Sequence, residues 1–317
     1  NGKKLARIRT DYVRESYVHE AAADLNLGAL EDAEHPDNAP ICPLMFVDGT
    51  RKAYVTVRGG GLYVVDTQAT PMRVIKEFGR SQIAPAGCGG VVVGNKVYIN
   101  SGTANSSDLY VFDARTDALL KHLSLTDTGT DAHGMLLTGG GRYLWVANRA
   151  NGDNVVVIDT VRDEVVGIIP NVGSAPDLID AAPGALAQSR CEPATTAMCL
   201  APGGTRAFIS VRPPNPLTGG PAAAGEQTGI SVVSIAEGGR TGSQLFFVPV
   251  GDTNADIHAL AVRLTAATSA ARLPATGAGE ALGAGKGLWG AAWGGAALLS
   301  AVAAIGVRRW IVLRQQG

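Results

Sequence analysis

The chain carries an internal repeat, and the period of that repeat limits the fold more than any other feature. Three segments are nearly superimposable: 61–66 (GLYVVD), 108–113 (DLYVFD) and 154–159 (NVVVID), with closing aspartates 47 and 46 residues apart. A fourth copy, GISVVS, lies at 229–234. A period of this length is typical of arrays built from one repeated supersecondary unit.

Each repeat predicts four short strands. One strand precedes every copy, at 53–57, 97–100, 143–147 and 207–211, and another follows a short turn, at 73–78, 119–123, 164–169 and 244–250. An inner strand begins each set, such as 134–138. Four short strands of alternating polarity per unit form the blade pattern of a β-propeller. The sequence therefore predicts an all-β fold with four recognisable four-stranded blades, at 41–78, 86–123, 131–170 and 176–250.

The flanks of the array predict a larger propeller. Residues 3–10 have the pattern of an outer strand of an earlier blade, and 256–263 that of an inner strand of a later one. An acidic connection lies at 11–40, with helix expected at 14–25. Because propellers typically close with up to eight blades, we expect an incomplete propeller domain at 1–263, part of a seven-bladed ring whose N-terminal blades are missing from this chain.

An apparent insertion interrupts the fourth repeat at about 181–199. It leaves two choices for the inner strand of that blade, 176–181 or 196–201. Cys191 and Cys199 lie in this insertion and are candidates for a disulfide. The aspartates that close the third strands are expected to bond the backbone of the turn that follows, a catalytic aspartate being the alternative.

Polar residues recur where the inner strands enter the predicted central channel. Aligned on the aromatic residue of the second strand, these positions hold Cys42, Cys88, His133, Asp177 and His258. Cysteine and histidine are ligands for copper or zinc, so Cys42, Cys88, His133 and His258 are a candidate metal set. The alternative, which we favour, is a wet channel with no cofactor, in which polar groups bond backbone and water. A disulfide between Cys42 and Cys88 is a third interpretation.

Two arginines, Arg149 and Arg212, each follow a second strand. Their planar guanidinium groups suit an anionic ligand, or they bond carbonyls and the Asp or Asn of the next blade. The net charge of −1 argues against a nucleic-acid surface. The sequence also contains no nucleophile elbow, phosphate loop, zinc-protease helix or paired-carboxylate motif.

The C-terminal tail predicts an anchor. A linker at 264–287 precedes twenty uncharged residues at 288–307, which as a helix would cover roughly 30 Å, one hydrocarbon thickness. The basic tail at 308–317 then predicts a transmembrane helix with its C-terminus in the cytoplasm and the propeller on the extracellular face. Since the chain begins at Asn1 without a signal peptide, we expect a mature form or a fragment.

Within the linker, Leu273, Pro274, Ala275, Thr276 and Gly277 resemble the LPxTG sorting signal of Gram-positive surface proteins. The resemblance implies that a sortase cleaves after Thr276 and joins it to peptidoglycan, with the cell wall as the final location. Only about ten residues separate the last strand-like segment from this motif, so a permanent membrane anchor remains the alternative.

The repeats also resemble the YVTN-type β-propellers, a family of exported seven-bladed proteins, in 54–56 (YVT) and over roughly 41–263. Segments such as 87–90 (GCGG), 131–135 (DAHGM) and 176–180 (PDLID) resemble a subgroup of surface propellers of unassigned function. These features predict an exported, surface-anchored module that binds or scaffolds an unknown protein or small molecule without catalysis. The alternative is an exported metal-dependent oxidoreductase or lactonase-like enzyme with its site at the channel mouth, using His133, His258 and Arg212.

Overall fold

The structure is a computed structural model, and it describes residues 2–11, 13–41, 45–46, 50–85, 87–181, 206–212 and 228–250. The regular elements of these residues are β-strands and short 3-10 helices. One compact unit of the chain spans Asn1–Leu264, and a second, Thr265–Gly317, lies outside the described residues. The described part of the chain therefore has the predicted all-β architecture.

Four antiparallel sheets of four strands follow one another along the chain, and we number them blade 1 to blade 4. Blade 1 contains β5 (Met45–Phe46), β6 (Lys52–Thr56), β7 (Leu62–Asp66) and β8 (Arg73–Phe78). Blade 2 contains β9 (Gly90–Val93), β10 (Lys96–Thr103), β11 (Ser106–Asp113) and β12 (Leu119–Ser124). Blade 3 contains β13 (Thr130–Thr138), β14 (Tyr143–Ala150), β15 (Asn154–Asp159) and β16 (Glu164–Ile169). Blade 4 contains β17 (Pro176–Ala181), β18 (Arg206–Val211), β19 (Gly229–Ser234) and β20 (Gln244–Pro249).

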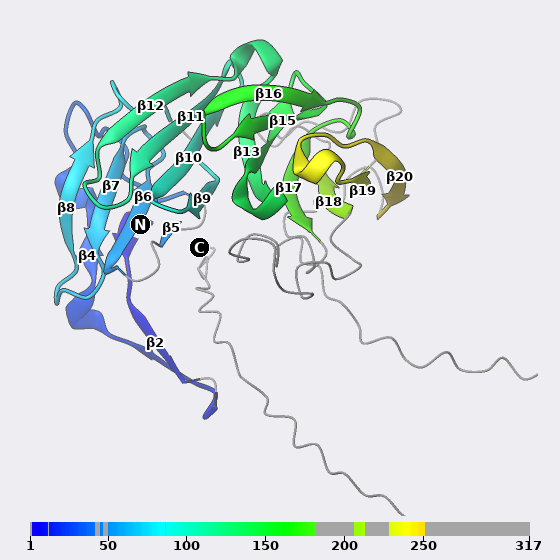
Figure 1. Cartoon of the computed structure of the whole chain (residues 1–317). Helices are drawn as coiled ribbons and strands as arrows, with labels where there is room; N and C mark the ends of the chain where they lie inside the picture. The colour runs from blue at the N-terminus through cyan, green and yellow to red at the C-terminus, as the bar shows by residue number, and fades with distance from the viewer. Residues whose placement is uncertain are drawn as a thin grey trace, which may run out of the picture. The chain divides into compact units, whose positions relative to one another are not determined.

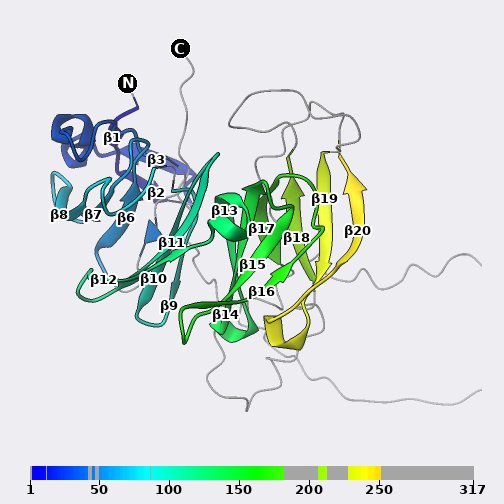
Figure 2. The ribbon, with the colours of Figure 1, turned by 90° about the horizontal axis from the view of Figure 1, so that it is seen from above.

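The blades stand side by side, each with its first strand on the inner side of the array and its fourth on the outer side (Figures 1 and 2). This arrangement is consistent with a β-propeller. In blade 4 the inner strand is β17, which pairs with β18 from Pro176↔Val211 to Ala181↔Ala207. Of the two choices that the sequence left open, the structure therefore selects 176–181.

The core lies between the blades, because the middle strands of blades 2 and 3 bury both of their faces. Three clusters join neighbouring blades, one at each junction. Tyr54, Leu62 and Val64 of blade 1 pack on Ile99, Tyr110 and Phe112 of blade 2; Tyr98, Leu109 and Val111 pack on Val146, Val156 and Ile158 of blade 3; and Trp145, Val155 and Val157 pack on Ala207, Ile209 and Val233 of blade 4. Burial on both faces explains why the strands read as nearly continuous apolar runs.

The aspartates that close the third strands have a structural role, as predicted. Asp113 Oδ1 accepts hydrogen bonds from the backbone amides of Arg115 and Thr116, both at 2.9 Å. Asp66 and Asp159 accept the same pair of bonds from their own turns. Each carboxylate satisfies amides that a tight turn leaves without a partner in the sheet.

Polar contacts also join each blade to the turn of the next. Tyr54 of β6 donates its hydroxyl to Asp117 Oδ1 at 2.6 Å, and Lys52 Nζ lies 2.8 Å from Asp117 Oδ2. Between blades 2 and 3, Tyr98 and Lys96 bind Asp163 in the same way. We call this set, a lysine and a tyrosine of one blade bound to the turn aspartate of the next, the inter-blade bridge. At the next junction Trp145 Nε1 donates to the carbonyl of Gly239 at 2.7 Å.

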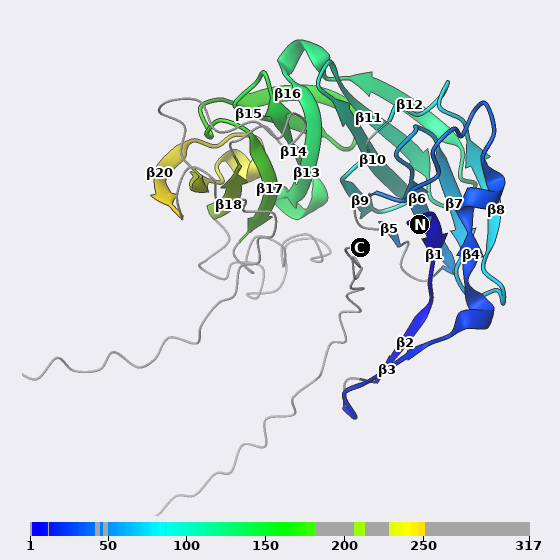
Figure 3. The same cartoon turned by 180° about the vertical axis from the view of Figure 1, so that it is seen from behind.

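The N-terminal residues differ from the prediction. Residues 3–10 do not form an outer blade strand: β1 (Lys4–Leu5) pairs with β4 (Leu25–Asn26), and β2 (Ile8–Asp11) forms a hairpin with β3 (Ser16–His19). Residues 14–25 do not form the expected helix, since they hold β3 and a single 3-10 turn at Ala21–Ala23. The segment forms two two-stranded sheets of its own and lies against blade 1, with β4 alongside β7 and β8 (Figures 1 and 3).

No helix among the described residues is long and apolar enough to cross a membrane. The predicted transmembrane helix at 288–307, the linker at 264–287 and the basic tail at 308–317 lie outside the described residues.

Candidate functional site

The inner strands of blades 3 and 4 carry the predicted channel residues at matching irregularities. In the β13–β14 pair the register shifts between Ala132 and Met135, and His133 lies in that interval. In the β17–β18 pair it shifts between Pro176 and Ile179, where Asp177 lies. A shift of this kind turns a side chain away from its regular alternation and is common beside functional sites. The two strands therefore present His133 and Asp177 toward each other.

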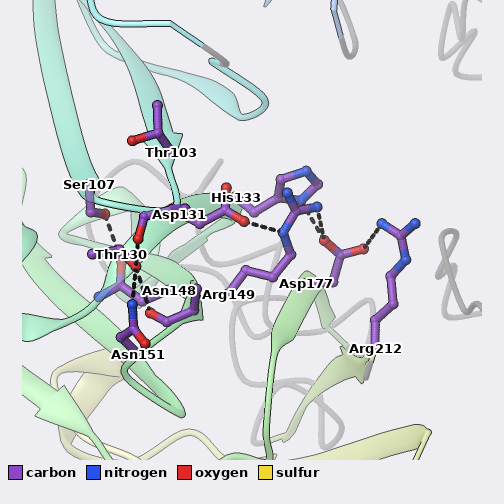
Figure 4. Close-up of polar contacts among 12 residues, drawn as sticks. Thr103, Ser107, Thr130, Asp131, His133, Asn148, Arg149, Asn151, Asp177 and Arg212 are labelled. Carbon is purple, nitrogen blue, oxygen red and sulfur yellow. Dashed lines mark hydrogen bonds and ion pairs between the residues drawn. The ribbon is translucent and has the colours of Figure 1, made fainter. Parts of the chain in front are cut away.

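Asp177 is the centre of a cluster of five ionisable side chains (Figure 4). His133 Nδ1 lies 2.7 Å from Asp177 Oδ1, and Arg149 Nη1 lies 3.3 Å from the same oxygen. Arg212 Nη1 lies 3.7 Å from Asp177 Oδ2. Arg149 also donates through Nε to Asp131 Oδ2 at 2.6 Å. Arg149 and Arg212 thus approach Asp177 from opposite sides, and the cluster joins blade 3 to blade 4.

Four of the predicted site residues, His133, Arg149, Asp177 and Arg212, therefore meet in space. The prediction that these arginines bond the Asp of the next blade is confirmed for Arg149, which contacts Asp177, whereas Arg212 contacts Asp177 of its own blade. Asp131 was not predicted as a site residue. Two signs pointed to it: it begins the segment 131–135, which parallels 256–258, and an acidic residue is the expected partner of a buried arginine.

The cluster is buried and its formal charges balance. The side chain of Asp177 is fully buried, those of Asp131 and Arg149 are 2% and 8% exposed, and that of Arg212 is 14% exposed. Two carboxylates face two guanidinium groups, so the ionic part carries no net charge. Removing one member of a buried ion pair costs about 3–5 kcal/mol because it leaves an uncompensated charge. The cluster is thus a fixed support, with Arg212 as its most exposed cation.

A second set of polar bonds supports the blade 2 side of this region. Asn148 of β14 accepts a hydrogen bond from Ser107 Oγ at 2.8 Å and donates to Thr128 Oγ1 at 2.9 Å. Asn151 Nδ2 donates to Thr130 Oγ1 at 3.0 Å. Figure 4 shows Ser107, Thr130, Asn148 and Asn151 beside Asp131. They tie the starts of β11 and β13 to the end of β14 and hold the backbone that carries Asp131.

A cavity of about 160 Å³ lies between the inner strands of blades 2, 3 and 4. Its lining consists of Cys88, Gly89, Gly90, Gly134, Met135, Leu178 and Ile179. Gly134 follows His133 directly and Leu178 follows Asp177, so the cavity and the charged cluster share two strands.

Glycine allows the inner strands around this cavity to approach closely. A Cβ on Gly89 would collide with the carbonyl oxygen of His133, and a Cβ on Gly134 would collide with that of Asp177. The two glycines occupy equivalent places on consecutive blades, and each faces the backbone of the following blade. Backbone therefore forms part of the cavity wall at the three glycines, and the side chains of Met135, Leu178 and Ile179 line the remainder together with Cys88.

The predicted metal set is altered by the state of Cys88. Cys88 is disulfide-bonded, and since thiolate sulfur is the metal-binding form, Cys88 is not a thiolate ligand. Its disulfide partner is one of Cys42, Cys191 and Cys199, which lie outside the described residues, as does His258. Among the described residues no group of three or more His, Cys, Asp or Glu side chains is placed to hold a metal ion.

Neither a protein-family model nor a curated protein matches the chain. Among solved structures, it is similar to a chain of the "Mitotic Checkpoint Complex", at 10% identity and a TM-score of 0.52, over 79% of this chain and 62% of that one. It is also similar to a functionally unknown protein from Desulfotomaculum acetoxidans DSM 771, at 10% identity and a TM-score of 0.52, over 80% and 64%. A third structure, the periplasmic gluconolactonase PpgL of Pseudomonas aeruginosa, has 14% identity and a TM-score of 0.48, over 77% and 63%.

The chain spans less than two thirds of the length of each of these structures. At 10% identity the first two similarities concern the fold alone. Together with the four antiparallel sheets of the described residues, they support a β-propeller-like fold.

Proposed function

We propose that the protein is an exported, surface-anchored β-propeller that acts as a binding or scaffold module without catalysis. We place its ligand-binding position at Arg212 and the cavity between the inner strands. The observation that carries this proposal is the buried cluster around Asp177, which combines five ionisable side chains at one junction. Well-packed apolar residues stabilise such a junction as well as or better than ion pairs, so blade packing alone does not require this cluster.

The different contacts and exposures of the two arginines indicate the class of ligand. Arg149 contacts two carboxylates, those of Asp131 and Asp177, and is 8% exposed. Arg212 contacts Asp177 at the longer distance of 3.7 Å and is more exposed. A guanidinium group binds a carboxylate through two parallel hydrogen bonds. The arrangement therefore suits a small ligand that carries a carboxylate, with Asp177 keeping Arg212 in place.

Thermal unfolding of the full chain with D-gluconate, D-glucuronate and citrate as probes tests this function. We expect at least one probe to raise the melting temperature in a saturable way. Arg212→Gln should abolish the shift, whereas Arg142→Gln should not. Arg142 is the matched control because it also pairs with a buried aspartate, Asp159, at 2.6 Å. It precedes β14, at the opposite end of that strand from Arg149 and the charged cluster.

Two outcomes would contradict the proposal. One is the absence of a shift with all three probes, and the other is an equal shift in wild type and Arg212→Gln. Turnover of a sugar lactone by the wild type that is lost in His133→Ala would replace the binding function with an enzymatic one.

The surface location in this proposal rests on the tail. We infer that a sortase cleaves after Thr276 and attaches the protein to peptidoglycan on the extracellular face. In the alternative, the segment 288–307 is the permanent membrane anchor with a cytoplasmic C-terminus. The motif at 273–277, the apolar run and the basic residues that follow it support both versions, and the fate of Thr276 distinguishes them.

A further inference from the structure

Blade 2 receives blade 1 through three kinds of contact on one face. On blade 2 these are an apolar patch of Ile99, Tyr110 and Phe112, the hydroxyl of Tyr110, and the turn that follows β11. The hydroxyl accepts a hydrogen bond from the backbone amide of Ala84 at 3.0 Å. Blade 1 has the same face, but no blade among the described residues packs on it. The N-terminal segment, defined here as residues 3–38, covers it.

The apolar contacts of the N-terminal segment fall on equivalent positions. When the repeats are aligned on their closing aspartates, Tyr63 and Val65 of blade 1 match Tyr110 and Phe112 of blade 2. Val55, Tyr63 and Val65 pack with Leu5 and Leu27 of the segment. All five side chains are buried, Leu5 at 8% exposed and the other four at 0%. Two leucines thus contact the patch that a neighbouring blade contacts elsewhere.

The tyrosine hydroxyl is also used equivalently. Tyr63 accepts a hydrogen bond from Asn38 Nδ2 at 2.9 Å, as Tyr110 accepts one from the Ala84 amide. Asn38 is fully buried, and its Nδ2 donates also to the carbonyl of Leu27. In blade 1 the donor, Asn38, belongs to the N-terminal segment, and in blade 2 the donor, Ala84, belongs to the loop between blades 1 and 2. Each of these segments lies over the face that carries the tyrosine.

Arg7 takes the place of the bridge lysine at blade 1, where Thr70 stands at the position of the turn aspartate. On the turn of blade 2, Lys52 Nζ of blade 1 donates to the carbonyl of Ala114, one residue after the closing Asp, and to the carboxylate of Asp117, four residues after it. On the turn of blade 3, Lys96 of blade 2 makes the same two contacts, with Thr160 and Asp163. In blade 1, Arg7 Nη1 donates to the carbonyl of Thr67 at 3.1 Å and Nη2 donates to Thr70 Oγ1 at 3.0 Å. These are again the first and fourth residues after the closing aspartate, Asp66.

We propose that the N-terminal segment is a surrogate blade: it occupies the blade-docking surface of blade 1 and caps the array there. The apolar patch, the tyrosine hydroxyl and the bridging cation are three independent observations that the segment contacts blade 1 as a neighbouring blade would. A blade cannot pack directly on blade 1 while the segment covers this face. The cap also places the hairpin of β2 and β3 away from blade 1 (Figure 3), where Tyr17 and Val18 are 61% and 44% exposed.

Hydrogen exchange of the full chain tests the surrogate. In Arg7→Ala we expect the amides of β6, β7 and the turn at 67–70 to exchange about ten- to hundredfold faster, the range for losing hydrogen bonds to a charged donor. Blades 3 and 4 should be unaffected. Arg9→Ala is the matched control, because Arg9 lies on the hairpin with a side chain 70% exposed, and it should change nothing in blade 1.

An exchange of residues gives the decisive comparison. The double variant Arg7→Lys/Thr70→Asp rebuilds the lysine–aspartate pair of the other blades and should restore wild-type protection of blade 1, whereas Thr70→Asp with Arg7→Ala should not. Unchanged exchange in Arg7→Ala, or faster exchange spread evenly over all four blades, would overturn the proposal. So would a failure of the lysine–aspartate pair to restore protection.

Discussion

Tyr54 tests how the blades are held together. Its hydroxyl donates to Asp117 at 2.6 Å, and the two residues are 1% and 7% exposed. Tyr54→Phe removes the donor but keeps the ring, and Lys52 still pairs with Asp117. Because a hydrogen bond to a charged group contributes about 1.5–3 kcal/mol, we expect the variant to lower the free energy of unfolding by about 2 kcal/mol at pH 7.

The cost of Tyr54→Phe should shrink at alkaline pH. Burial, followed by the bond to Asp117, raises the pKa of Tyr54 above its ordinary value of 10.0. Well below pH 10, Tyr54 is neutral in both the folded and the unfolded protein. Above pH 10 the tyrosine of the unfolded protein ionises first, and the stability that the neutral Tyr54 contributes is lost as the pH rises. At pH 11 the wild type has lost about 1.4 kcal/mol through this group, which phenylalanine cannot lose.

Urea denaturation at pH 7 and at pH 11, at equal ionic strength, measures both effects. The gap between wild type and Tyr54→Phe should narrow from about 2 kcal/mol to below about 1 kcal/mol. Tyr17→Phe is the control, since Tyr17 is 61% exposed, and it should change stability by less than about 0.5 kcal/mol. The reasoning is refuted if the two variants behave alike at pH 7, or if the gap is the same at both pH values.

Three further predictions concern other parts of the chain. Hydrogen bonds from the backbone amides of its turn hold the pKa of Asp113 below the ordinary 3.8, so its contribution is present above about pH 4 and lost as the pH falls; thermal unfolding of Asp113→Asn should depend less on pH between 6 and 3. Gly134→Ala should lower stability by about 1–3 kcal/mol because its Cβ would collide with the Asp177 carbonyl, whereas Gly167→Ala, whose Cβ would have its nearest neighbour at 3.6 Å, should leave the melting temperature nearly unchanged. Thr276→Ala should leave the protein extractable from cells with detergent, and a wild type that is equally extractable would contradict attachment to the wall.

Local features of the blades could be predicted because short-range rules determine them. Alternating apolar residues and a closing Asp specify a strand followed by a tight turn, and the bonds of Asp113 to its own turn bear this out. Alignment of the repeats also placed His133 and Asp177 at matching positions. Equivalent positions on adjacent blades are neighbours in space, and in the structure His133 Nδ1 and Asp177 Oδ1 lie 2.7 Å apart.

The N-terminal residues show where local pattern fails. Residues 3–10 have the apolar and polar alternation of an outer strand. The sequence of a short strand does not specify the strand with which it pairs. Leu5 and Leu27 are buried because blade 1 offers them an apolar face, and the residues that make this face lie some 30 to 60 positions away in the chain. Because of this tertiary packing, residues 3–10 form part of the cap on blade 1 and not the outer blade strand that we predicted.

By itself the sequence determined the repeat, the all-β class and the residues that close each turn, because each of these depends on contacts within one blade. Only the tertiary structure decided which segment fills the inner strand of blade 4, how Arg149 joins Asp131 to Asp177, and what covers blade 1. These features depend on the free energy of burying charges and apolar surface between segments distant in sequence. The periodicity of residues along one strand carries no information about this burial free energy.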